Sequence, residues 1–220
     1  MRMKSVINLP VLGPMGIAPL MIASMAPVGM VVARILYTQH ISHLFLVWNL
    51  FLAWIPLGLA LLAWRTRRRP FLAAALGFLW LLFLPNAPYL VTDLIHLRPN
   101  PTVPMWYDLG MLFSFAFAGL ALGLRSLQLM QGIVKERFGV LAGWIFALTI
   151  CLISSFGIYI GRFLRWNSWE FLLHPGRLTA DVLDHLASPD ALLRLFTIVI
   201  LFGSVTIVGL LMFPANEATR

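Results

Sequence analysis

The sequence predicts an all-α, polytopic bundle of about six transmembrane helices, on the basis of its composition, its long apolar runs and the placement of its charges. Hydrophobic residues make up 60% of the 220 residues, and charged residues make up only 11%. Charged residues account for about a quarter of an ordinary soluble protein, so 16 basic and 8 acidic residues are too few to cover a water-facing surface. A water-soluble globular fold is therefore excluded.

Six stretches are long and apolar enough to cross a bilayer, which takes about 20 residues in a helix. The first resembles a signal peptide, but Pro27 directly follows the cleavage-like triplet Ser24–Ala26, so we expect a retained helix. Ser188 followed by Pro189 predicts a helix N-terminus, and the residues from 178 to 186 predict a short amphipathic helix before it. The predicted spans, within a single membrane domain of residues 1–220, are 11–33, 44–64, 71–91, 105–124, 140–160 and 195–213.

The basic residues set the expected orientation of these spans. Ten of the 16 Lys and Arg residues fall at the two termini and in the second and fourth loops, and the run Arg65–Arg69 is the densest group. Six of the eight acidic residues and all five histidines fall on the other side. The positive-inside rule then predicts a bacterial inner-membrane protein with both termini in the cytoplasm. A site among the acidic residues and histidines would open outward.

The net charge of +8 does not indicate nucleic-acid binding, because the basic residues lie in short loops between apolar runs and act as topology signals. The single cysteine, Cys151, lies inside an apolar run, which excludes an intramolecular disulfide and a cysteine metal cluster. The sequence has no zinc-protease, P-loop or dinucleotide-binding motif. It therefore predicts no cofactor, no resident metal and no nucleic-acid partner, and the lipid bilayer is the expected surrounding.

The segment Leu84–Leu97, LPNAPYLVTDLIHL, closes the third span and is the most unusual in the chain. Pro85 and Pro88 prevent a regular helix about 20 Å into a hydrocarbon core that is about 30 Å thick. Irregular backbone at that depth is tolerated where it is buried in protein or lines a polar cavity. We expect either a cavity, with Asn86 and Tyr89 satisfying the freed backbone groups, or a simple kink with Asn86 capping the next turn.

Asp93 and His96 stand three residues apart, which places them on one face of a helix. This spacing suits an orienting carboxylate–imidazole pair, a proton relay or two ligands of one metal ion. The alternative is that both are ordinary residues of the membrane interface. A metal ion would need a third ligand from elsewhere in the chain.

Asp108 follows Trp106 and Tyr107 at the start of the fourth span. Tryptophan and tyrosine are typical interfacial residues, and an aspartate in the first turn complements the helix dipole. The functional alternative makes Asp108 the counter-charge to an arginine of the fifth loop.

The fifth loop begins with the segment GRFLRWNSWE. Arg162 and Arg165 are three residues apart, so a helix leaving the membrane would present two guanidiniums together, a geometry suited to a phosphate or carboxylate headgroup. Asn167, followed three residues later by Glu170, predicts a capped short helix. The alternative is that this loop provides only interfacial anchoring and salt bridges.

LPNAPYLVTDLIHL, the triplet Trp106–Asp108 and GRFLRWNSWE together resemble a bacterial family of multi-pass membrane proteins known only as a domain of unknown function. The resemblance runs from about Phe71 to Phe213 and implies an integral membrane domain with no established activity, substrate or cofactor. The positions that it singles out are Asn86, Tyr89, Asp93, His96, Asp108, Arg162, Arg165, Asn167 and Ser168.

The residues favour an outward-facing polar site formed by the broken end of the third span, the start of the fourth and the loop after the fifth. The favoured hypothesis is not enzymatic: the site binds or translocates a lipid headgroup or small anion, with Arg162 and Arg165 as clamps. Asp93, His96 and Asp108 would orient these arginines. A second hypothesis is an outer-leaflet enzyme with His96 as general base and Asp93 as its orienting group. A third is a scaffold that binds other membrane proteins.

Overall fold

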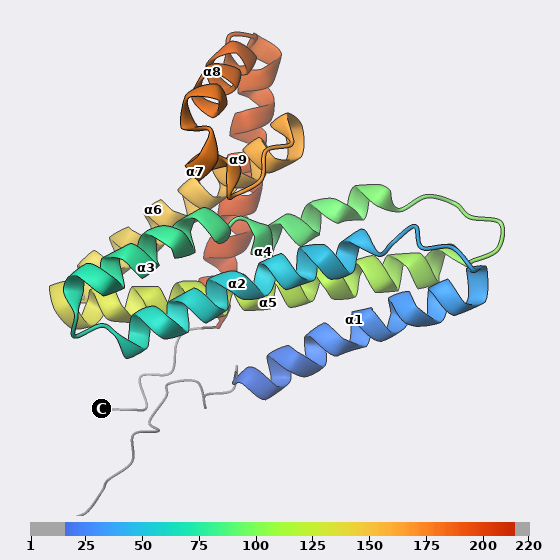
Figure 1. Ribbon diagram of the computed structural model, residues 1–220, viewed down its shortest axis with the longest axis horizontal. Helices are drawn as coiled ribbons and strands as arrows, with labels where there is room; N and C mark the ends of the chain where they lie inside the picture. Colours follow the sequence, from blue (N-terminus) through green and yellow to red (C-terminus); the bar gives the residue numbers. More distant parts are fainter. Residues whose placement is uncertain (1–15, 214–220) are drawn as a thin grey trace, which may run out of the picture.

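The computed structural model describes residues 16–213, and all regular structure within them is helical. Six segments are long and apolar enough to cross a membrane, which confirms the all-α, multi-pass class. The elements are α1 (Ile17–Thr38), α2 (Phe45–Arg65), α3 (Pro70–Phe83), α4 (Asn86–Tyr89), the 3-10 segment η2 (Leu90–His96), α5 (Met105–Phe138), α6 (Val140–Tyr159), the π-helical turn η3 (Ile160–Leu164), α7 (Glu170–Leu173), α8 (Pro175–Leu186) and α9 (Pro189–Met212) (Figure 1).

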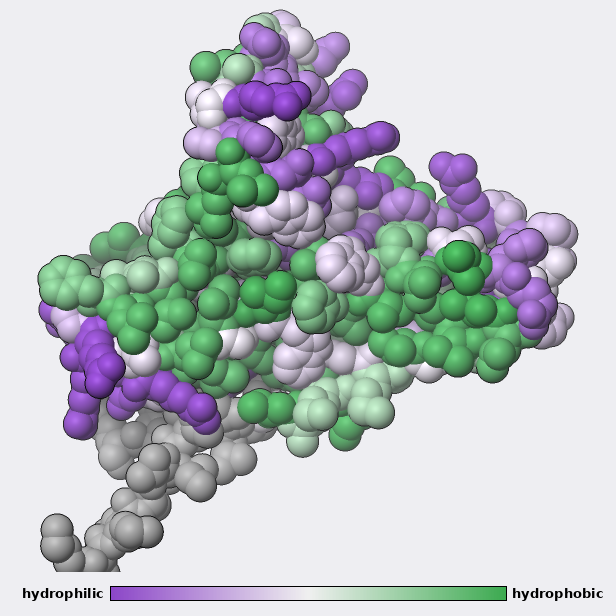
Figure 2. Space-filling model, in the orientation of Figure 1, coloured by the Kyte–Doolittle hydropathy of each residue, from purple (hydrophilic) through white to green (hydrophobic). Residues whose placement is uncertain are grey.

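Helix α5 lies at the centre of the bundle and packs against α1, α2, α4, η2 and α6. Its Phe115 and Leu122 are fully buried, as are Leu46 of α2 and Ala147 of α6. Figure 1 shows α1, α2 and α5 running alongside one another, whereas α9 crosses their common direction steeply and packs against α6. Figure 2 shows hydrophobic side chains over the middle of the bundle and hydrophilic ones at its two ends and over α7 and α8.

The helices that contain the first and fourth predicted spans extend beyond them, and charged residues that the sequence placed in loops are buried inside these helices. Helix α1 continues through Arg34 to Thr38 instead of ending at residue 33. Helix α5 continues through the buried Arg125 to Phe138 instead of ending at Leu124. The predicted start of the first span, at residues 11–15, lies outside the described residues.

The segment before the last span agrees closely with the sequence. The predicted amphipathic helix is present as α8, and α9 begins at Pro189, six residues earlier than the expected hydrophobic span. The Ser188 hydroxyl accepts a hydrogen bond from the backbone N–H of Ala191 at 3.2 Å, which confirms the predicted N-cap.

The third span is broken where its prolines predict. Helix α3 ends at Phe83, a turn carries Leu84 and Pro85, and the chain resumes as the single turn α4 followed by η2. The broken segment packs directly on α5, where Gly119 leaves room for it: a Cβ at this position would collide with the carbonyl oxygen of Ala87. The irregular backbone is thus buried against protein, as the depth of the break requires.

Candidate functional site

A cavity of about 520 Å³ lies beside the break in the third span, between α2 and the turn η3. Cavities of this volume hold small ligands. Seven of the nine positions singled out from the sequence line it: Asn86, Tyr89, His96, Arg162, Arg165, Asn167 and Ser168. The structure therefore brings the third span and the fifth loop together, as predicted, although 65 residues of chain separate His96 from Arg162.

Asn86 connects the two parts of this lining. Its Nδ2 donates a hydrogen bond to the carbonyl oxygen of Phe83 at 2.9 Å and another to the hydroxyl of Ser168 at 2.8 Å. Asn86 therefore caps the end of α3, and the expected cap on the following turn is not formed. The hydrogen bond to Ser168 holds the fifth loop against the broken end of the third span.

Asp93 lies behind the cavity lining and is 2% exposed, so the interpretation that it is an ordinary interfacial residue was wrong. Its Oδ2 accepts a hydrogen bond from Nδ2 of Asn49 at 2.9 Å. Its Oδ1 lies 3.8 Å from Nη1 of Arg162 and 3.8 Å from Nδ1 of His96. One buried carboxylate thus lies within 4 Å of side chains from α2, η2 and η3, and only Asn49 is hydrogen-bonded to it.

His96 is held by the backbone rather than by the predicted carboxylate–imidazole hydrogen bond. Its Nδ1 lies 3.1 Å from the carbonyl oxygen of Asp93, closer than it lies to the carboxylate. The ring also packs against Phe45, with a centroid separation of 4.9 Å. An Nδ1–H that donates to this carbonyl leaves Nε2 as the basic nitrogen.

Arg162 and Arg165 reach the same cavity by a route that the sequence did not predict. Arg162 lies in the π-helical turn η3, and Arg165 ends that turn with a left-handed backbone (φ 59°). The two side chains therefore do not share one face of a regular helix. Within residues 16–213, the one ion pair of the Arg162 side chain is with Asp93 at 3.8 Å, and the Arg165 side chain makes no hydrogen bond or ion pair.

Asp108 lies apart from the cavity, and its predicted pairing with an arginine of the fifth loop was wrong. Its carboxylate accepts hydrogen bonds from Nε and Nη2 of Arg34 at 2.7 and 3.1 Å. Both side chains are 4% exposed. Arg34 is the nearer partner because α1 packs along α5, whereas the fifth loop is drawn toward the broken segment.

The rim of the cavity is fixed by the fifth loop. The backbone N–H and the side-chain amide of Asn167 donate to Oε2 of Glu170 at 2.6 and 3.0 Å. The predicted short helix is present as α7, but its N-cap is Trp169 and no side chain caps it, so the prediction that Asn167 caps this helix was wrong. Nε1 of Trp166 donates to Oδ2 of Asp181 in α8 at 3.1 Å. These bonds hold the loop, and with it Arg165, beside the cavity.

Sequence reasoning missed three residues of α2 that line the cavity, Trp48, Asn49 and Leu52. Asn49 is the only amide side chain in α2, and a lone polar residue within an apolar span is the signal that could have found it. Among the described residues, no group of three or more His, Cys, Asp and Glu side chains is arranged to hold a metal ion.

Fold and cavity together define a multi-pass helical membrane protein with a polar cavity beside a broken span. A protein-family model described as "Protein of unknown function (DUF1361)" matches residues 48–208. The chain belongs to this family, in agreement with the resemblance carried by its motifs. Comparison with curated proteins and with solved structures finds no match.

Proposed function

We propose that the protein binds an anionic group, carried by a lipid or a small anion, in the cavity beside the broken span. The supporting observation is the imbalance of charge around that cavity. Arg162 and Arg165 both line the cavity, and within residues 16–213 the only carboxylate that pairs with either is Asp93, which lies 3.8 Å from Arg162 and also accepts a hydrogen bond from Asn49. Guanidinium donors that lack a full set of partners favour a phosphate or carboxylate ligand.

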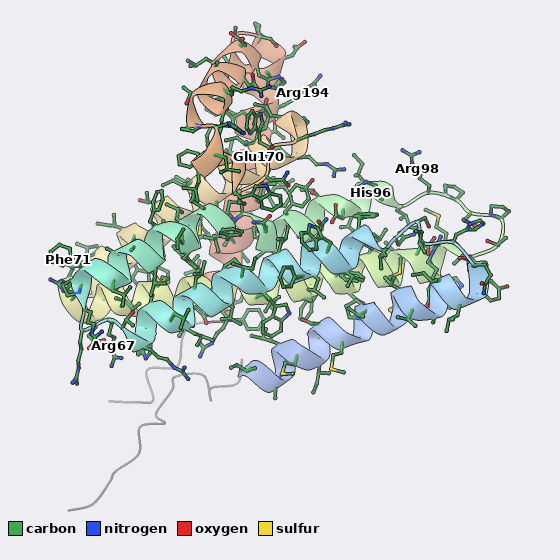
Figure 3. All side chains as sticks on the ribbon, in the orientation of Figure 1. Arg67, Phe71, His96, Arg98, Glu170 and Arg194 are labelled. Carbon is green, nitrogen blue, oxygen red and sulfur yellow. The ribbon has the colours of Figure 1, made fainter. Side chains whose placement is uncertain are left out.

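The proposed site faces outward from the bacterial inner membrane. Figure 3 shows Arg67 and Phe71 at one end of the bundle and His96 and Arg98 toward the other. The end that carries Arg67 holds the densest run of arginines, which the positive-inside rule assigns to the cytoplasm. The cavity beside His96 then opens on the opposite side, and both termini lie in the cytoplasm.

The test is native mass spectrometry of the full chain purified in detergent. We expect a co-purifying anionic ligand that is lost in the double variant Arg162→Gln/Arg165→Gln. The matched control is Arg177→Gln/Arg194→Gln, which removes the same charge from two exposed arginines outside the cavity. A wild-type protein without an anionic ligand, or an equal ligand content in the two double variants, would contradict the proposal.

The geometry of His96 supports a second candidate, an enzyme of the outer leaflet. Its side chain is 40% exposed and lines the cavity with Nδ1 engaged, so Nε2 is free to act as a general base beside the arginines. The test is release of headgroup from phosphatidylglycerol vesicles, followed by mass spectrometry. His96→Ala should abolish release while the protein stays folded, and unchanged release would exclude His96 as the base.

A further inference from the structure

The lining of the cavity combines basic and apolar groups. Arg162, Arg165 and His96 are its basic residues, whereas Leu52, Pro85 and Gly157 contribute apolar surface. Leu52 lies seven residues into α2 from Phe45, which corresponds to about 10 Å along the helix axis. Measured from the outer end of α2, the cavity wall at Leu52 therefore lies within the outer half of a hydrocarbon core about 30 Å thick.

One wall of the cavity continues onto the lipid-facing surface of the bundle. Trp48 lines the cavity and is nevertheless 55% exposed. It contacts Phe51, which is 56% exposed, with ring centroids 5.4 Å apart. Because both residues belong to a membrane-spanning helix, their exposed surfaces face acyl chains. The wall at Trp48 is thus shared between the cavity and the lipid-facing surface of α2.

This combination fits an amphiphile better than a free anion. A hydrated anion would use the two guanidiniums, but it would gain nothing from the apolar part of the lining or from the aromatic wall that faces the bilayer. A lipid carries a charged phosphate and apolar chains on one molecule. Its phosphate matches the arginines, and its chains match the exposed surface of α2.

We infer that the occupant of the cavity is a phosphate-bearing lipid that enters sideways from the outer leaflet. Its phosphate lies between Arg162 and Arg165, and its acyl chains lie along Trp48 and Phe51. This inference rests on the proposed function, because it names the source of the anionic group that the site binds.

The test compares two probes on the full chain in detergent, by titration in native mass spectrometry. Dioleoyl phosphatidylglycerol carries the phosphate with acyl chains, and glycerol 3-phosphate carries the phosphate without them. The variants are Arg162→Gln/Arg165→Gln and Trp48→Ala/Phe51→Ala. The control for the aromatic pair is Phe113→Ala/Phe117→Ala, two residues of α5 that are 61% and 57% exposed and lie outside the cavity. Thermal unfolding of each variant confirms that it is folded.

We expect the arginine variant to bind both probes at least about tenfold more weakly. The Trp48→Ala/Phe51→Ala variant should bind phosphatidylglycerol several-fold more weakly and glycerol 3-phosphate unchanged, and the α5 control should bind both probes like the wild type. Phosphatidylglycerol binding that depends on the arginines but not on Trp48 and Phe51, or that falls equally in the α5 control, would overturn the lipid inference and leave the anion site in place. Binding of both probes independent of the arginines would overturn the proposed function itself.

Discussion

The molecule contains two arginine–aspartate pairs that differ in how completely they are closed. Arg34 and Asp108 meet through two hydrogen bonds, the shorter of 2.7 Å, with both side chains 4% exposed. Arg162 and Asp93 approach only to 3.8 Å, and the Arg162 side chain is 20% exposed beside a cavity. In the closed pair, Arg34–Asp108, the guanidinium donors are hydrogen-bonded, so the pair stabilises the fold. In the open pair, Arg162–Asp93, guanidinium donors remain available to bind a ligand.

Breaking the closed pair should have the largest effect on stability. Asp108→Ala leaves the Arg34 guanidinium buried without its partner, which costs about 3–5 kcal/mol of unfolding free energy. The measurement is chemical unfolding in detergent. The double variant Arg34→Met/Asp108→Leu, which replaces both charges by apolar side chains, should recover most of the loss. A wild-type stability for Asp108→Ala would show that the pair is not structural.

The open pair depends on the broken segment staying against α5, and Gly119 tests this contact. Gly119→Ala places a Cβ against the backbone carbonyl of Ala87, so the segment must shift, at a cost of about 1–3 kcal/mol. Gly110→Ala in the same helix is the control, because its added Cβ meets only the end of the Met30 side chain at 3.8 Å. Thermal unfolding compares the two variants, and equal stability would contradict the packing described here.

Removing the carboxylate of the open pair should act on binding more than on stability. Asp93→Asn takes away the negative charge 3.8 Å from Arg162, so the affinity for glycerol 3-phosphate should rise by about three- to tenfold. Asp190→Asn, at an exposed position of α9, changes the net charge equally and should leave the affinity unchanged. Weaker binding by Asp93→Asn would mean that Asp93 positions the arginines and that its charge does not compete with the ligand.

The smallest effect is expected from His43, in the loop beside the closed pair. Burial, together with the nearby Arg34 and His96, holds the pKa of His43 below its ordinary value of 6.5, and Asp108 opposes this shift. The unfolded chain therefore binds the proton more readily, so the contribution of His43 to stability is present above pH 6.5 and is lost as the pH falls below it.

His43→Gln should accordingly reduce the loss of thermal stability between pH 7.5 and pH 5.5. His40→Gln, at an exposed position of the same loop, serves as the control and should keep the wild-type loss. An identical pH dependence in the wild type and His43→Gln would show that His43 is not linked to folding in this range.

Much of the site could be predicted because its signals are local. Pro85 and Pro88 fix the break, since neither offers the backbone donor that a regular helix needs. The spacing of Asn167 and Glu170 predicts their contact, which forms, although Trp169 and not Asn167 is the N-cap of α7. The lone amide of Asn49 in an apolar span marks a polar position, but helix packing alone sets its hydrogen bond to Asp93, 44 residues away.

The sequence by itself determined the class of protein and the break in the third span, because these follow from hydropathy and proline chemistry. Only the tertiary structure decided which arginine meets which aspartate. The choice rests on helix packing: α1 lies along α5 and brings Arg34 to Asp108, whereas the fifth loop folds onto the broken segment and brings Arg162 to Asp93. A hydrogen bond forms at donor–acceptor distances of about 2.7–3.2 Å and is lost at 3.8 Å, so these distances separate a structural pair from a candidate binding site.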